Sequence, residues 1–368
     1  MMSVSRVHIK QDASPGALKG RGTSLNPANR FETARQEAFD DGWDHEEEPT
    51  RPQTTLIRDA TRSIIARNDS PDLSFETSVN PYRGCEHGCV YCFARPSHAY
   101  LGFSAGLDFE TKIVFKPEAP RLLEKELSRP GYKPGVIVLG SNTDPYQPVE
   151  RTLGITRAIL EVLERFNHPV GIVTKSAGVA RDKDILARMA EKGLAKVHLS
   201  ITTLDPALAR AMEPRAASPA RRLTAIGELA RAGIPVGVMA SPMIPGLNDA
   251  EMERILEEAA KAGATSAYTT MLRLPYELGA LFSDWLEKYL PERAAHVLSL
   301  IRQSRSGQLN DSQFHARFVG SGPYAAMMAQ RFSRTMERLG LDETRSRLDV
   351  SHFRIPGRTP ANLQMSLF

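Results

Sequence analysis

The sequence predicts an α/β fold whose central element is a partial barrel of six strand–helix units. From residue 73 onward, short runs of β-branched residues alternate with amphipathic stretches, which is the pattern of alternating strands and helices. The loops between them are short, and strands joined through helices in this way form a parallel sheet. The units recur about every 35 residues, too few times for a closed barrel of eight units, which needs roughly 250 residues.

The expected elements follow one another along the chain. The strands are predicted at 73–79, 136–139, 170–174, 196–202, 235–240 and 265–272. The helices between them are predicted at 151–166, 182–192, 220–232 and 249–262, and Gly, Asn or Pro follows most of them as a stop signal. Two more helices, 278–304 and 324–339, follow the barrel. Functional groups are therefore expected at the carboxyl ends of the strands.

Composition divides the chain into four regions. Residues 1–55 are polar, show no helical or strand period and are predicted to be a flexible extension. Residues 56–275 are expected to form the barrel, 276–345 a helical region packed on it, and 346–368 a flexible tail. Within the extension, residues 21–32 combine turn formers with two Arg and a Phe, so this piece is a candidate for docking on the barrel. The alternative is a solvated tail.

Composition also narrows the class of protein. With 368 residues, 41% of them apolar, the chain is long enough for a substantial core. The net charge of +4 is only weak evidence for a nucleic-acid partner. No apolar stretch approaches the roughly 20 residues of a membrane span, and the first residues lack the apolar core of a signal peptide. The sequence predicts a cytoplasmic protein with no membrane partner.

The three cysteines of the chain, Cys85, Cys89 and Cys92, lie close together directly after the first predicted strand. Closely spaced thiols in a reducing compartment bind metal or do redox chemistry more often than they form disulfides. Three thiolates can hold three irons of a four-iron cluster and leave the fourth iron open, whereas electron-transfer clusters use four cysteines. The alternative is a structural zinc site with His87 or His98 as the fourth ligand, but such sites usually pair two separated cysteine knuckles.

Polar residues recur at the ends of the later strands. Lys175 follows the third strand as a cation that can bind an anionic group, and alternation on the fourth strand places the hydroxyls of Ser200 and Thr202 on the inner face with His198. Each has a structural alternative: a solvated lysine, or hydroxyls bonded to neighbouring backbone. The loop after the second strand contributes Ser141, Asn142, Thr143 and Asp144, for which the alternative is an Asp–Pro turn that caps the next helix.

A second group of polar residues follows the fourth strand. Arg215, Arg221 and Arg222 lie near the start of a predicted helix. These cations are expected either to bind a cofactor or a phosphate, or to lie in water. The sequence assigns no catalytic residue.

The Cys-x3-Cys-x2-Cys spacing, with the aromatic Tyr91 before the last cysteine, resembles the signature of the radical S-adenosylmethionine (radical SAM) superfamily. The resemblance implies that Cys85, Cys89 and Cys92 hold a [4Fe–4S] cluster and that Tyr91 lies beside the adenine of S-adenosyl-L-methionine. It also implies reductive cleavage of that cofactor to a 5′-deoxyadenosyl radical, which abstracts hydrogen from a substrate. Such an enzyme takes its electron from a donor such as ferredoxin or flavodoxin.

Three later motifs resemble the spore photoproduct lyase-like branch of this superfamily. They are residues 141–150, 174–176 and 244–249, and the likeness extends over roughly residues 75–275. The resemblance implies that the first of these loops lies by the methionyl part of the cofactor, that Lys175 meets its carboxylate, and that Ser200 and Thr202 meet its ribose hydroxyls. Segments 95–102 and 108–116 resemble a bacterial subgroup of unknown substrate. The chain departs from spore photoproduct lyase itself, because it has no fourth cysteine and carries Phe93 where a tyrosine is expected.

Three functions remain open on this basis. A radical enzyme acting on nucleic acid, in DNA repair or modification, is favoured by the branch resemblance and by arginines that recur near the C-terminus. A radical enzyme acting on a protein or small molecule is the alternative, since one fold hosts many substrates. A non-enzymatic, metal-bound adaptor is the third hypothesis.

The last five residues, Gln364 to Phe368, resemble the short peptide by which bacterial replication and repair proteins bind the DNA polymerase sliding clamp. Leu367 and Phe368 would be the paired apolar anchors, and Gln364 would supply an orienting hydrogen bond. The alternative is that Leu367 and Phe368 fold back onto the barrel, since exposed apolar pairs tend to be covered. Clamp binding would bring the enzyme to DNA.

Overall fold

The fold is centred on a seven-stranded sheet in the order β10-β9-β8-β7-β6-β3-β2. The computed structural model describes residues 18–32, 52–342 and 347–357. All neighbouring strands are parallel except β2, which is antiparallel to β3. The strands are β2 (Ile65–Arg67), β3 (Thr77–Val79), β6 (Ile137–Leu139), β7 (Val170–Thr174), β8 (Ala195–Ser200), β9 (Val236–Met243) and β10 (Ser266–Met271). The predicted six-stranded parallel sheet is thus confirmed, and it does not close into a barrel.

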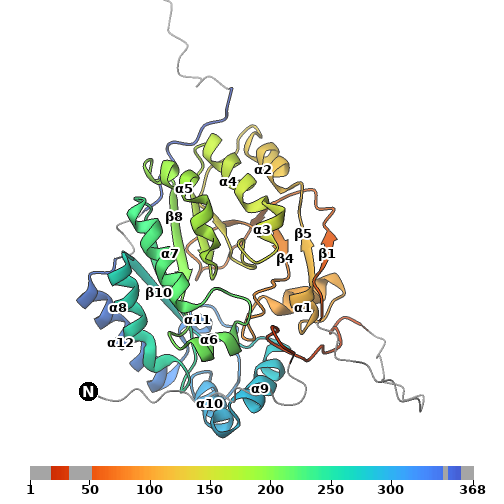
Figure 1. Cartoon of the computed structure of the whole chain (residues 1–368), viewed down its shortest axis with the longest axis vertical. Coiled ribbons are helices and arrows are strands. Elements are labelled where there is room, and N and C mark those ends of the chain that lie inside the picture. Colours follow the sequence, from red (N-terminus) through yellow and green to blue (C-terminus); the bar gives the residue numbers. More distant parts are fainter. Residues whose placement is uncertain (1–17, 33–51, 343–346, 358–368) are drawn as a thin grey trace, which may run out of the picture.

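Helices cover the outer face of this sheet (Figure 1). They are α2 (Ala119–Leu127), α3 (Glu150–Leu153), α4 (Ile155–Arg165), η2 (Ala177–Asp182), α5 (Lys183–Ala190), α7 (Pro219–Arg231), η3 (Asp249–Glu251), α8 (Met252–Ala262) and α12 (Gly322–Leu339). None of the helices in the described ranges is long and apolar enough to cross a membrane.

Three elements differ from the sequence-based prediction for local reasons. The helix predicted at 278–304 is two helices, α9 (Leu278–Tyr289) and α10 (Pro291–Gln303), because proline has no amide hydrogen to continue a helix and begins a new one at 291. The strand predicted at 73–79 begins only at Thr77, because Asn68 bonds the carbonyl of Phe75 and the amide of Ser70 and so holds 68–75 as a loop. The helix predicted at 151–166 is divided at Gly154, which adopts a left-handed conformation with φ of 63°. Glycine takes this conformation without steric cost and therefore ends one helix and starts the next.

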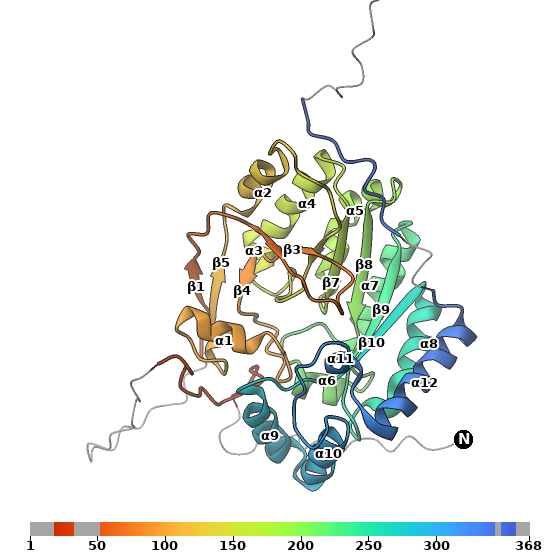
Figure 2. The same ribbon diagram turned by 180° about the vertical axis from the view of Figure 1, so that it is seen from behind.

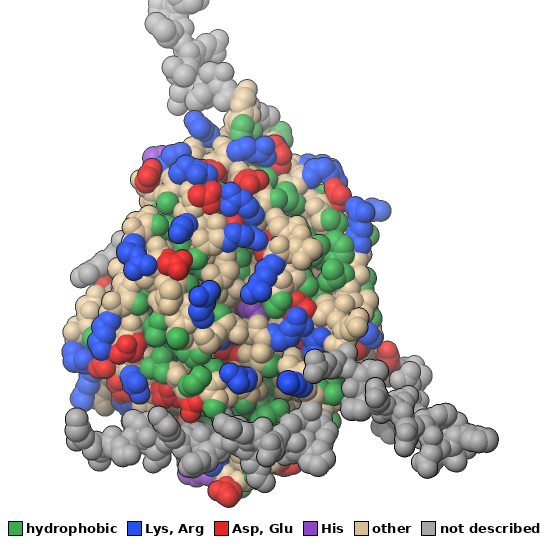
Figure 3. Space-filling view, in the orientation of Figure 1, with side chains coloured by type: hydrophobic (Ala, Val, Ile, Leu, Met, Phe, Trp, Pro, Cys, Tyr) green, Lys and Arg blue, Asp and Glu red, His purple; other side chains and the backbone are tan. Residues whose placement is uncertain are grey.

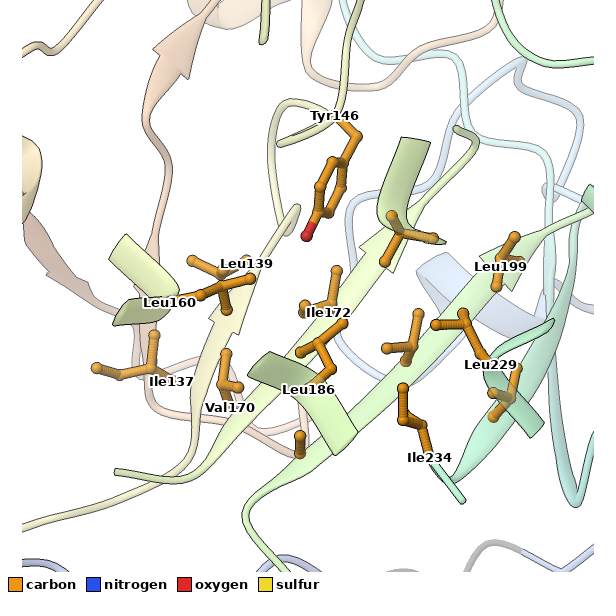
Figure 4. Close-up of a cluster of buried hydrophobic side chains, with 14 of the residues drawn as sticks. Ile137, Leu139, Tyr146, Leu160, Val170, Ile172, Leu186, Leu199, Leu229 and Ile234 are labelled. Carbon is orange, nitrogen blue, oxygen red and sulfur yellow. The ribbon is translucent and has the colours of Figure 1, made fainter. Parts of the chain in front are cut away.

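The main core lies between the sheet and the helices. Figure 4 shows Ile137, Val170, Ile172 and Leu199 of the strands together with Leu160, Leu186 and Leu229 of α4, α5 and α7. All seven side chains are completely buried. Because strand residues alternate between faces, burying these residues outward turns their neighbours toward the inside of the barrel.

The inner face carries polar side chains beside the apolar Val138, Val173 and Met239. His198 and Ser200 of β8 point to the side opposite the helix-facing Val197 and Leu199. On the next strands the Ser241 hydroxyl lies 2.6 Å from that of Thr270. These polar side chains can bind a ligand that carries hydroxyl and amide groups.

A smaller sheet and a group of helices hold the first loop of the barrel. The order of this sheet is β1 (Thr55–Arg58), β5 (Lys112–Phe115), β4 (Tyr82–Arg83). Beyond the carboxyl end of β8 lie α6 (Pro206–Met212), α9 (Leu278–Tyr289) and α10 (Pro291–Gln303), as Figures 1 and 2 both show. These helices form a second core with Val90 and Tyr91. Helices α6, α9 and α10 therefore pack against the cysteine loop.

The open side of the barrel lies between the edge strands β2 and β10. The segment that contains α11 (Ala316–Val319) bridges this side, as Figure 2 shows next to β10. Arg317 of α11 forms an ion pair with Asp72, which lies in the loop after β2, and the amide of His315 donates to the same carboxylate. This contact joins the two edges without a strand.

Candidate active site at the carboxyl ends of the strands

The cysteine loop follows β4 and ends in η1 (Arg95–Leu101) and α1 (Asp108–Thr111). Cys85 and Cys89 are buried and Cys92 is partly buried. The amide of Cys85 donates to the carbonyl of Phe109 over 2.9 Å, and the amide of Val90 donates to the carbonyl of Met212 over 3.0 Å. The loop is therefore fixed at both of its halves before any ligand binds.

A buried ion pair lies behind this loop. Arg95, fully buried, pairs with Glu110 and also donates to the carbonyls of Gly88 and Cys89 at 3.1 and 2.9 Å. Its other amino group donates to the carbonyl of Gly106 over 2.9 Å. A guanidinium with its five donors suits several carbonyls at once, so Arg95 positions the backbone that carries the thiols.

Residues 18–32, here called the N-terminal strap, lie against the cysteine loop. The amide of Gly22 donates to Glu110 over 2.9 Å, and Asn29 donates to the carbonyl of Ala99 over 2.8 Å. A Cβ atom on Gly22 would lie 1.7 Å from the carbonyl oxygen of Gly88, so only glycine permits this approach. Residues 21–32 are thus docked on the folded domain, which was one of the two alternatives for this piece.

Asp144 joins three parts of the site. It accepts hydrogen bonds from the Thr174 hydroxyl and the Lys175 amide, both 2.7 Å long, and its carboxylate lies 3.3 Å from Nδ1 of His87. Burial by itself would raise the pKa of Asp144, but the His87 side chain and these hydrogen bonds lower it to about 2. The loop after β6 is thereby held to the end of β7 and to the cysteine loop.

A second carboxylate lies behind Tyr91. Glu213 accepts hydrogen bonds from the Tyr91 and Thr202 hydroxyls and pairs with Arg222, whose side chain is 1% exposed. Burial opposes ionisation of Glu213, yet the charges of Arg222 and Lys175 and the hydrogen bonds lower its pKa to about 2. Arg222 is thus a buried structural partner, which excludes the solvated position considered for it.

The predicted cofactor-binding residues divide into two groups. Asp144 and Thr202 are fully engaged in the networks described above, and Thr143 donates to the carbonyl of Tyr82 over 2.8 Å. In contrast, within the described residues neither the Lys175 ammonium nor the Ser200 hydroxyl makes a hydrogen bond to protein. The Lys175 ammonium lies 5.7 Å from the centre of the Tyr91 ring, so it reaches the cysteine loop.

Ser141 and Asn142 are held by a residue that the sequence interpretation missed. Asn80, directly after β3, donates to the Ser141 hydroxyl over 3.2 Å and accepts from the amides of Asn142 and Thr143. The missed group comprises Asn80, Arg95, Glu110 and Glu213. The Asn–Pro pair at 80–81 directly after a strand was the available signal for Asn80, whereas buried ion pairs over long sequence distances leave no local pattern.

The side chains around the three thiols bear on the choice between an iron–sulfur cluster and a zinc ion. In the described residues, no group of three or more His, Cys, Asp and Glu side chains is arranged to hold a single ion. A zinc ion draws its ligands to within about 2.3 Å of one point, whereas thiolates of a four-iron cluster bind different irons. His87 is directed to Asp144, and His98 packs between Phe103 and Phe109. These observations favour the cluster over the zinc alternative.

The comparisons with known proteins agree with this site. Residues 79–259 match the model of the radical SAM superfamily, and the chain belongs to this superfamily. Its members use a [4Fe–4S] cluster and S-adenosylmethionine, so the chain is a radical SAM enzyme and these are its cofactors. Such enzymes need an electron donor.

Individual relatives cover most of the chain. An uncharacterized protein of Mycobacterium tuberculosis is 36% identical over 63% of this chain and 68% of its own. The protein named radical SAM Nalpha-GlyT isomerase, from Pseudomonas phage M6, is 22% identical over 74% of this chain and 53% of its own. Spore photoproduct lyase complexed with dinucleoside spore photoproduct has a similar fold, with a TM-score of 0.55, 17% identity, and 77% and 79% of the two chains covered.

Proposed function

We propose that this radical SAM enzyme acts on nucleic acid. When bound, the cluster and S-adenosylmethionine supply a 5′-deoxyadenosyl radical that takes a hydrogen atom from the substrate. The parts of this proposal that concern the cofactor rest on Lys175 and Ser200. Among the predicted cofactor residues, the Lys175 ammonium, the Ser200 hydroxyl and the Asn142 side-chain amide make no hydrogen bond to the described residues, and the ammonium and hydroxyl suit the carboxylate and the ribose of S-adenosylmethionine.

One observation carries the choice of nucleic acid. Arg30 of the N-terminal strap is surrounded by exposed aromatic rings where the strap meets η1 and the start of α9. The Arg30 guanidinium lies 4.8, 5.5 and 4.5 Å from the ring centres of Phe31, Tyr100 and Tyr276. The three aromatic residues are 58, 74 and 74% exposed. Exposed aromatic and arginine side chains of this kind stack with unpaired bases.

This aromatic group lies beside the cysteine loop. Arg30 donates to the carbonyl of Pro96 over 3.1 Å, four residues after Cys92, and pairs with Glu277. Broad charge plays a smaller part, because Lys and Arg are interspersed with Asp and Glu over the helix-covered face (Figure 3). The name of one structurally similar protein, a lyase complexed with a dinucleoside spore photoproduct, supports the same choice.

Transfer of deuterium tests this function. The cluster-loaded enzyme is incubated anaerobically with dithionite, S-adenosylmethionine and single-stranded DNA or RNA deuterated in its bases and sugars. We expect deuterium in the 5′-deoxyadenosine that forms. Deuterium-free 5′-deoxyadenosine with every strand would reject nucleic acid as the substrate and favour a protein or a small molecule.

A further inference from the structure

A ladder of alternating aromatic and arginine side chains runs from the cysteine loop to the open side of the barrel. Phe93, directly after Cys92, lies 5.9 Å from the Arg273 guanidinium, which lies 5.0 Å from the ring of Phe318. Arg317 in turn lies 4.8 Å from Phe318 and 4.9 Å from Phe314. Phe93 and Phe314 are 50 and 54% exposed, so both ends of this aromatic ladder meet solvent.

The arginines of this region differ in how their charges are satisfied. Arg317 pairs with Asp72, and Arg305 donates to the carbonyls of Met271, Leu272 and Ala316. Within the described ranges, Arg273 makes no hydrogen bond, and its Nε is covered and without an acceptor.

An unpartnered donor of this kind costs free energy in the protein alone, so its retention calls for an explanation. Asp72 is the carboxylate that acts on Arg273 through space, but Arg317 already binds it. Burial and the neighbouring Arg317 lower the pKa of Arg273. The two terminal nitrogens of Arg273 are not covered, so an anion from outside the described chain can reach them and match the excess positive charge.

We propose that Arg273 binds a backbone phosphate of the nucleic-acid substrate, next to the nucleotide that reaches the cysteine loop. This inference rests on the proposed function and adds the contact that fixes the position of the strand. The guanidinium lies beside the Phe93 and Phe318 rings, and a planar guanidinium binds phosphate through two parallel hydrogen bonds. The exposed ring of Phe93 offers a stacking surface to the adjacent base.

Binding of a fluorescein-labelled single-stranded DNA 12-mer to the cluster-loaded protein tests the anchor. Loss of one charge-assisted contact predicts about tenfold weaker binding for Arg273→Ala at low salt. The slope of log K against log salt is expected to fall by about 0.7, the value for one phosphate on a single strand. Arg273→Lys should restore part of both. Arg188→Ala is the matched control, since Arg188 lies on α5 and pairs with Glu164 at an exposed position.

A set of 12-mers, each with one neutral methylphosphonate linkage, identifies the phosphate. In the unaltered protein, one or two adjacent positions should weaken binding, and in Arg273→Ala the same positions should have no effect. Equal losses at those positions in both proteins would reject the anchor but leave nucleic acid as the substrate. No binding of any strand by the unaltered protein would reject both proposals.

Discussion

The wall behind Tyr91, formed by Glu213, Thr202 and Arg222, contains an arginine with a fully buried side chain, and the rim around Arg273 contains one with a covered Nε, but the two arginines are satisfied differently. In the wall, Arg222 pairs with Glu213 and donates to the carbonyls of Ser200 and Ala217 at 2.9 and 2.8 Å. At the rim, Arg273 touches two rings and, among the described residues, no acceptor. Satisfied buried networks make a site rigid, whereas a donor without an acceptor in the protein can bind a ligand. We therefore propose that the wall is the cofactor half of the site and that the region around Arg273 is its substrate half.

The largest effect is expected in the cysteine loop. Replacing any one of Cys85, Cys89 or Cys92 by Ala should abolish the oxygen-sensitive cluster, because the remaining two thiolates leave two irons without protein ligands. Iron content and the visible spectrum after anaerobic reconstitution measure this. Phe93→Tyr is the matched control, since it keeps all three thiols and should keep the cluster. A cluster of normal stoichiometry in a Cys→Ala variant would contradict the ligand assignment.

The buried pair in the wall should have the next largest effect. Glu213→Gln leaves Arg222 buried without its counter-charge, and breaking such a pair costs about 3–5 kcal/mol of unfolding free energy. Chemical denaturation of the cluster-loaded protein measures the loss. Glu164→Gln, which removes an exposed pair with Arg188, should cost less than about 1 kcal/mol. Equal losses in the two variants would show that the wall is not the rigid half.

Acid should weaken the cofactor half first. Asp144 and Glu213 both have a pKa of about 2, below their ordinary values of 3.8 and 4.5. The unfolded chain therefore binds protons first as the pH falls, so stability that is present above about pH 4.5 is lost between pH 4.5 and 2, about 2 kcal/mol for Asp144 and about 3 kcal/mol for Glu213. Unfolding midpoints across this range measure the loss. Replacing each carboxylate by its amide should flatten the profile, and an unchanged profile would contradict the assignment.

The aromatic group around Arg30, which comprises Phe31, Tyr100 and Tyr276, should affect the binding of nucleic acid more than folding. Tyr276→Ala removes an exposed ring that stacks on Arg30, and loss of one stacking surface predicts about tenfold weaker binding of single-stranded DNA. The melting temperature should remain nearly unchanged. Tyr132→Phe provides a control away from this group. The Tyr132 hydroxyl that it removes lies 2.8 Å from Nε2 of His168. Unaltered DNA affinity in Tyr276→Ala would remove this ring from the binding surface.

The smallest effect on stability is expected for Arg273. Arg273→Gln removes a charge that has no partner among the described residues, so the free energy of unfolding should change by no more than about 0.5 kcal/mol. Arg222→Gln is the comparison in the wall and should be strongly destabilising, because it leaves Glu213 buried and unpaired. A large loss for Arg273→Gln would show that the rim is structural, like the wall.

Much of the barrel could be predicted from the sequence, because its strands are buried on the outer face and follow helices with clear stop signals. The strand predicted at 170–174 has the observed bounds, and Val170 and Ile172 explain why, since both face the helix layer. The small sheet β1-β5-β4 was missed, because its strands are two to four residues long and pair over large sequence separations. Short strands of this kind carry no period that could reveal them.

The site could be predicted where chemistry is concentrated locally, as in the cysteine loop and in the loop that carries Asp144. The partners of these loops could not. Glu110 and Glu213 read as ordinary charged residues in the sequence, and only the fold brings them to Arg95 and to Tyr91. The tail residues Gln364 to Phe368 lie outside the described residues, so clamp binding stays a prediction.

The central claim is that the cofactor half is complete in this chain, and formation of 5′-deoxyadenosine tests it most directly. The protein is reconstituted anaerobically with iron and sulfide, reduced with dithionite and incubated with S-adenosylmethionine and single-stranded DNA. The account predicts 5′-deoxyadenosine from the unaltered protein, none from Cys89→Ala, and a higher KM for the cofactor in Lys175→Ala. An intact cluster that yields no 5′-deoxyadenosine under these conditions, or equal yields from the unaltered protein and Cys89→Ala, would contradict it.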